Sequence, residues 1–93
     1  MANQLEEARK IINEVDAQMA ELFVKRMRAA EMVYEYKKEF GLPILDIKRE
    51  EAVIQRNAAL VEDSVLKEYY IEYQKQVMAL SRAYQQKMKD EGR

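Results

Sequence analysis

The sequence predicts an all-α protein, a chain of three helices whose very long first helix pairs with a second copy in an intertwined helical-bundle homodimer. Three observations support this prediction. The 93 residues include only two glycines and one proline, fewer turn residues than a set of strands would need. Apolar residues recur every three or four positions, which is the period of a helix. Good capping residues stand at the expected helix ends, and the length suits a single domain, residues 1–93.

The first helix is expected over residues 3–40. It begins at Asn3, a good N-cap residue, with Glu6 three positions later in the manner of a capping box. It ends where Gly41 can adopt the left-handed conformation and Pro43 prevents continuation. Its seam alternates spacings of three and four residues, as in a coiled coil. The seam residues are Leu5, Ala8, Ile12, Val15, Met19, Leu22, Arg26, Ala29 and Val33.

Two shorter helices are expected over residues 46–61 and 64–90. Asp46 is a good N-cap for the second helix, and Asp63 or Ser64 for the third. The core-facing residues expected on the second helix are Ile47, Glu50, Val53, Ile54, Asn57 and Leu60. Those expected on the third are Leu66, Tyr70, Val77, Ser81, Tyr84 and Met88.

The unequal helix lengths predict self-association. The first helix is about 50 Å long, whereas the second is only about 23 Å long. Much of the apolar stripe of the first helix therefore has no partner within the chain. A two-fold symmetric dimer, with two first helices side by side, is the simplest way to cover the stripe. A heteromeric coiled-coil partner is the alternative.

Composition excludes several classes of function. The chain has no cysteine and no histidine, which excludes disulfides, thiolate metal sites and imidazole chemistry. Sixteen basic and seventeen acidic residues are interspersed, so neither nucleic acid nor an anionic membrane is an expected partner. No apolar run approaches a membrane span, and the start MANQLEEARK lacks the apolar region of a signal peptide. We therefore expect a cytoplasmic protein.

Each helix carries a polar residue on its apolar seam. These residues are Arg26, Glu50 and Ser81, and Lys37 follows Arg26 by eleven positions, close to three full turns. A buried ion pair between Arg26 and Glu50 is one interpretation. The other is an anionic ligand, because Arg26, Lys37 and Arg49 bring more positive charge than this one carboxylate neutralises.

A set of spaced elements extends over essentially the whole chain. They are the run ARKIINEVD, Lys25 with Arg26, Lys37, the loop GLPILDIKRE, and Ser81 with Gln85. Together they resemble the all-helical class of chorismate mutase. Members of that family are intertwined dimers of three-helix chains, and they convert chorismate to prephenate by a Claisen rearrangement, in phenylalanine and tyrosine biosynthesis. The resemblance implies the same fold, the same substrate and an isomerase activity without metal or other cofactor.

The resemblance also implies which residues form the site: Arg9, Arg26, Lys37, Asp46, Arg49, Glu50, Ser81 and Gln85. Arg9 and Arg26 lie about 25 Å apart along one helix, too far for both to hold one small ligand. Arg9 is therefore expected to serve the site of the other subunit, which the family resemblance also implies.

The implied roles suit the substrate and the reaction. Arg9 and Arg26 can hold the two carboxylates of chorismate in bidentate contacts, and Arg49 and Ser81 can support them.

The resemblance implies that the remaining four residues serve the ether oxygen and the ring hydroxyl of the substrate. Lys37 and Gln85 can donate to the ether oxygen, where negative charge grows as its bond to the ring breaks. Glu50 can accept from the ring hydroxyl, and Asp46 can fix the preceding loop as an N-cap. Because a glutamine donates at any pH, activity is expected to vary little between about pH 5 and 9.

Purely structural roles are open for several of these residues. Lys37 or Lys38 could be a solvated cation at the helix end, and Arg9 could be an exposed partner of Asn13 or Asp16. Asp46 could act only as a helix cap, and Ser81 could be only a small spacer between helices. Arg28, Arg56 and Arg82 are expected on the solvated surface. Two other functions are also open: an isochorismate pyruvate lyase of the same fold, and a non-catalytic helical dimerisation module whose inward charges set the register.

Overall fold

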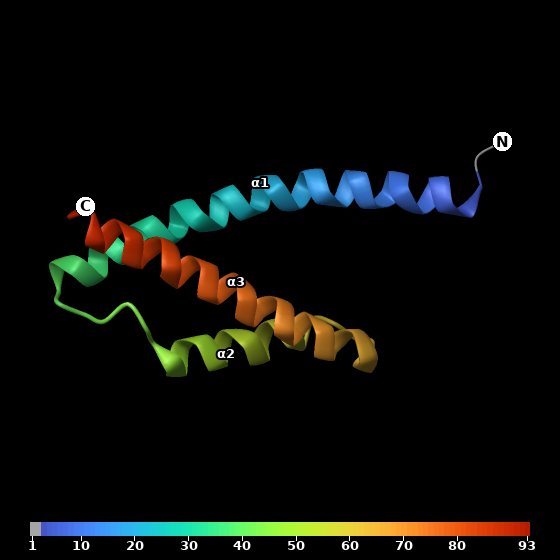
Figure 1. The fold of residues 1–93 in the computed structure, drawn as a ribbon. Coiled ribbons are helices and arrows are strands. Elements are labelled where there is room, and N and C mark those ends of the chain that lie inside the picture. The colour runs from blue at the N-terminus through green and yellow to red at the C-terminus, as the bar shows by residue number, and fades with distance from the viewer. Residues whose placement is uncertain (1–2) are drawn as a thin grey trace. The chain divides into compact units, whose positions relative to one another are not determined.

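The computed structural model describes residues 3–93, which form three helices joined by two loops (Figure 1). The helices are α1 (Gln4–Glu39), α2 (Ile47–Ala58) and α3 (Ser64–Asp90). No strand occurs in this described part of the chain, so the predicted all-α class is confirmed. The helix ends agree with the prediction to within one residue, except that α2 ends at Ala58 and not at residue 61.

The helices begin at the capping residues that the sequence predicts. The backbone N–H of Glu6 donates to Oδ1 of Asn3 at 2.9 Å. Asp46 caps α2, where its carboxylate accepts from the N–H of Arg49 at 3.0 Å. Asp63 caps α3 by accepting from two amides of the first turn. Each cap satisfies donors that have no partner inside the helix, which is why the helices start at these residues.

A Schellman motif ends α1. Gly41 has a φ of 64°, in the left-handed region that glycine adopts without strain. The N–H of Leu42 donates to the carbonyl of Lys37 at 2.8 Å, and the N–H of Gly41 donates to that of Lys38 at 3.4 Å. The motif therefore fixes the backbone at Lys37, one of the predicted site residues.

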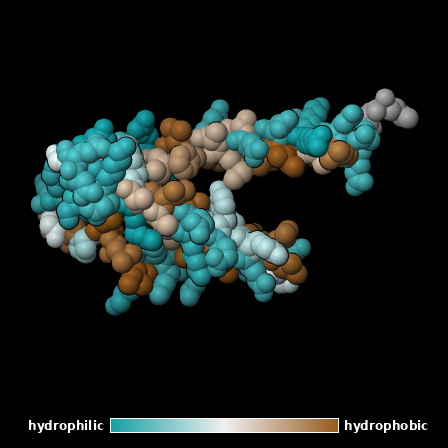
Figure 2. Space-filling view, viewed as in Figure 1, coloured by the Kyte–Doolittle hydropathy of each residue, from teal (hydrophilic) through white to brown (hydrophobic). Residues whose placement is uncertain are grey.

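The chain divides into two units, residues 1–32 and 33–93, and the division falls within α1. The predicted single domain, residues 1–93, stays a prediction. The described part of the first unit is a single helical segment that carries an exposed apolar stripe, and Figure 2 shows hydrophobic surface along it. The exposed residues of this stripe are Leu5, Ile12, Val15, Met19, Leu22 and Phe23. An uncovered stripe of this length is typical of a surface that binds a partner.

The second unit holds a small core between α2 and α3, which pack side by side (Figure 1). Its buried hydrophobic residues are Tyr34, Ala58, Met78 and Met88. Nδ2 of Asn57 on α2 donates to Oε1 of Gln74 on α3 at 3.1 Å. This hydrogen bond lets a polar face of α3 point inward without the cost of unpaired polar groups.

The last turns of α1 also belong to the second unit, where they are hydrogen-bonded to Arg93, three residues beyond the end of α3. The hydroxyl of Tyr34 donates to the main-chain oxygen of Arg93 at 2.9 Å. Nζ of Lys38 donates to the same oxygen at 2.7 Å. The residues around Lys37 therefore have a defined place beside the end of α3.

Three of the predicted core positions are exposed within this one chain. Ile47 and Leu60 are largely exposed, and Leu60 lies beyond the end of α2. Leu66 on α3 is exposed too. The buried residues of α3 are Gln74, Met78, Ser81, Gln85 and Met88, so the inward face is more polar than the predicted stripe and lies to one side of it.

Candidate active site

The predicted site residues are divided between the two units. Arg9 and Arg26 belong to the first unit, where both are exposed on α1. Seventeen positions separate them on one continuous helix, or about 25 Å. One copy of the chain therefore cannot bring both arginines to the same small ligand. The other six lie in the second unit: Lys37, Asp46, Arg49, Glu50, Ser81 and Gln85.

Ser81 and Gln85 are buried one turn apart on the inward face of α3. Their exposed fractions are 9% and 6%, which places both side chains in the interior of the second unit. Oγ of Ser81 donates to the carbonyl of Val77 at 3.1 Å, a local bond that satisfies a hydroxyl inside a helix. Within residues 3–93, no buried side-chain nitrogen or oxygen lacks a hydrogen-bond partner. Both residues thus face inward: the predicted seam of the third helix includes Ser81, whereas Gln85 is indicated by the family resemblance.

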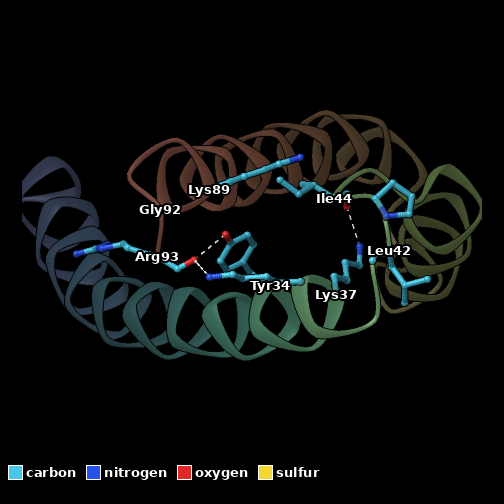
Figure 3. A pocket seen from close by; sticks show the side chains of 10 residues that line it. Tyr34, Lys37, Leu42, Ile44, Lys89, Gly92 and Arg93 are labelled. Carbon is cyan, nitrogen blue, oxygen red and sulfur yellow. Dashed lines mark hydrogen bonds between the residues drawn. The ribbon is translucent and has the colours of Figure 1, made fainter.

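Lys37 and Lys38 are neighbours with different surroundings. Lys37 is half-buried, and its Nζ donates to the carbonyl of Ile44 in the following loop at 2.7 Å (Figure 3). Lys38 is exposed and reaches the main-chain oxygen of Arg93. Lys38 is therefore the more exposed of the two lysines, and Lys37 is the one turned toward the loop.

A cavity of about 460 Å³ lies beside Lys37 in the second unit (Figure 3). Tyr34 and the loop residues Leu42, Pro43 and Ile44 supply apolar wall. Four cations also line it and no acidic residue does; the cations are Lys37, Lys38, Lys89 and Arg93. The volume is that of a small-molecule pocket. Of the eight predicted site residues, Lys37 alone lines it, so this cavity does not bring the predicted site together.

The first turn of α2 brings Asp46, Arg49 and Glu50 together. Asp46 is the N-cap, so the structural role that the sequence left open for it is present. Arg49 is exposed, while Glu50 is half-buried. One interpretation of the sequence paired Glu50 with Arg26 in a buried ion pair. In the structure, Glu50 forms its ion pair with Arg82 of α3.

The expectation that Arg82 lies on the solvated surface is wrong. Its side chain is 34% exposed, and that of Glu50 is 25% exposed. Sequence reasoning missed Arg82 because it stands beside the predicted seam, directly after Ser81. One signal could have found it: an inward glutamate on α2 needs a cation, and Arg82 is the arginine next to the inward face of α3.

Two further properties of residues 3–93 bear on the kind of site. No three side chains of His, Cys, Asp or Glu lie together in a group that could hold a metal ion. None of the three helices has an apolar stretch long enough to cross a membrane.

Comparison with known proteins finds a family match over most of the chain. The family model described as chorismate mutase type II matches residues 8–86. No curated protein and no solved structure matches the chain significantly. The matched segment includes every predicted site residue, from Arg9 to Gln85.

Proposed function

The chain belongs to the chorismate mutase type II family, and on that premise we propose that it catalyses the Claisen rearrangement of chorismate to prephenate. The match over residues 8–86 is the observation that carries the proposal. The activity is that of an isomerase, on the route to phenylalanine and tyrosine. Its active form is a homodimer with two identical sites.

The reaction determines what the site has to supply. A pericyclic rearrangement needs neither a nucleophile nor a general base. It needs the flexible substrate held in a compact, reactive conformation, and donors aimed at the ether oxygen as negative charge grows there. A site built from arginine, lysine, glutamine and serine can meet both needs without histidine or cysteine.

Lys37 and Gln85 are the proposed donors to the ether oxygen. Nζ of Lys37 already donates to an uncharged oxygen, the carbonyl of Ile44 at 2.7 Å, and a substrate oxygen can replace this acceptor. Gln85 is buried, so water competes little for its N–H groups. Lys37 and Gln85 both belong to the second unit.

Arg9 and Arg26 are the proposed carboxylate anchors, with Arg9 coming from the second copy of the chain. Their separation of about 25 Å on one helix supports this division. The exposed stripe of α1 supports a helical partner for the same segment. Arg26 also counts as catalytic, because a carboxylate held in place restricts the substrate to its reactive conformation.

The other four residues complete the proposed binding site. Arg49 and Ser81 support the carboxylate contacts, and Glu50 accepts from the ring hydroxyl. Asp46 fixes the start of α2, where its cap to Arg49 holds the first turn.

The first test is an assay of the purified protein with chorismate and, separately, with isochorismate, following the loss of the substrate's ultraviolet absorbance and measuring prephenate and pyruvate. Prephenate without pyruvate is expected. Pyruvate from isochorismate, with no prephenate from chorismate, would identify a lyase of the same fold. A folded dimer that turns over neither compound would contradict both enzymes and favour a dimerisation module.

The donor role of Gln85 predicts a change of pH profile in Gln85→Glu. Glutamate donates only when it is protonated, so the variant is expected to be active below the pKa of the new carboxyl and to lose activity above it. A model glutamate has a pKa of about 4.3, and burial raises it. At pH 8 we expect kcat/KM about 100-fold below that of the unmodified protein, with partial recovery near pH 5.

The measurement is kcat/KM between pH 4.5 and 8.5 for both proteins. Gln76→Glu, on the exposed side of α3, is the matched control and should keep the flat profile of the unmodified protein. A flat profile for Gln85→Glu would remove Gln85 from the donor role.

A further inference from the structure

An ion pair between Glu50 and Arg82 joins α2 to α3, and the proposed function gives Arg82 no role. The two residues are 32 positions apart in sequence, and Nη1 of Arg82 donates to Oε1 of Glu50. Neither side chain is fully exposed, at 34% for Arg82 and 25% for Glu50. Partial burial weakens screening by water, so the pair is held more firmly than one on an open surface.

Arg82 stands among residues of the proposed site. It directly follows Ser81 and precedes Gln85 by three positions, and both of these are buried on α3. Its partner Glu50 is in the first turn of α2, next to Arg49. The pair thus links the two helices that carry four of the eight proposed site residues.

The geometry of a carboxylate leaves room for a second contact. Arg82 occupies Oε1 of Glu50, and a carboxylate has two oxygens with about four acceptor positions. The ring hydroxyl of the substrate can therefore be accepted while the pair stays intact. A guanidinium is planar and rigid, so it fixes the orientation of the carboxylate that it holds.

Charge gives the pair a second consequence. Chorismate carries two carboxylates, and an uncompensated glutamate in the same site would repel them. The guanidinium of Arg82 neutralises Glu50. The proposed carboxylate anchors Arg9 and Arg26, and the proposed donor Lys37, therefore stay available to bind the substrate.

We propose that Arg82 is a positioning residue: it holds the Glu50 carboxylate in place to accept from the ring hydroxyl of the substrate and cancels its charge. This inference rests on the proposed function. Arg82 acts through Glu50 and makes no contact of its own with the substrate.

A double-mutant cycle tests the proposal. Arg82→Met, Glu50→Gln and the double variant are compared with the unmodified protein by kcat and KM for chorismate, at a temperature where circular dichroism shows all four folded. Arg82→Met is expected to lower kcat/KM about tenfold when Glu50 is present, and less than about twofold in the Glu50→Gln background. Arg56→Met removes an exposed arginine of α2 and is expected to leave activity unchanged.

The conservative variant separates charge from orientation. Arg82→Lys keeps the positive charge but not the planar fork. Its KM for chorismate is expected to match that of the unmodified protein, because the charge that controls KM is kept. Its kcat is expected to stay below that of the unmodified protein. A role in stability alone would move neither constant once the variants are folded.

Two results would overturn the inference while leaving the proposed function standing. Equal losses in both backgrounds would mean that Arg82 acts independently of Glu50. No loss in Arg82→Met, with a loss in Glu50→Gln, would mean that Glu50 needs no positioning. Failure of the unmodified protein to turn over chorismate is a different result, since it overturns the proposed function and this role together.

Discussion

A mixture of equal amounts of Arg9→Ala and Arg26→Ala chains is expected to regain about a quarter of the activity of the unmodified protein, although each variant alone has almost none. Each single variant loses a bidentate hold on one substrate carboxylate at both of its sites. We expect such a loss to lower kcat/KM by about 100-fold to 1,000-fold, as the removal of a preorganised charge contact does elsewhere.

The recovery follows from the symmetry of the dimer. Random pairing makes about half of the dimers hybrids. In a hybrid, one site receives an intact Arg26 from its own chain and an intact Arg9 from the other chain. In the second site of the hybrid, both arginines are replaced by alanine. One good site in half of the dimers gives about a quarter of the full activity.

The experiment is carried out by unfolding the two variants together and refolding them, with a size measurement to show that dimers form again. A matched control is the mixture of Arg26→Ala with Lys37→Ala. In the proposal both residues serve the site of their own chain, so no hybrid site is complete and no activity should return. If Arg9 served its own chain instead, the Arg9→Ala and Arg26→Ala mixture would stay inactive as well.

The sequence is sufficient to predict the helices because their ends are determined locally. Asn3, Asp46 and Asp63 each satisfy amides within three residues of themselves. Gly41 ends α1 through its own backbone conformation. Such signals need no knowledge of the tertiary structure, and five of the six predicted helix ends therefore agree with the observed ones to within one residue.

The packing could be predicted only in part, because it depends on how α2 and α3 meet. The spacing of Ser81 and Gln85 by four residues indicates a shared face, and both are buried. The pairing of Glu50 with Arg82 joins residues 32 positions apart, and no local pattern specifies it. Gln74 was missed for the same reason, since its hydrogen bond to Asn57 of α2 is what allows it inside.

Lys37→Ala is expected to lower kcat by about 100-fold to 1,000-fold, with a much smaller change in KM. Charge develops on the ether oxygen only as its bond breaks, so a donor to that oxygen stabilises the transition state more than the bound substrate. Losing such a donor lowers kcat by a larger factor than it raises KM. Steady-state kinetics with chorismate measures both constants.

Lys38→Ala is a closely matched control. It removes the same charge at the next position, and both lysines donate to a main-chain oxygen at 2.7 Å, Lys37 to Ile44 and Lys38 to Arg93. Each variant should lose about 1 kcal/mol of stability with its hydrogen bond, which thermal unfolding measures. Activity should separate them, because Lys38 is exposed and should change kcat less than about twofold. Equal losses of activity would mean that the general positive charge at this end of α1 matters, and that Lys37 has no specific role.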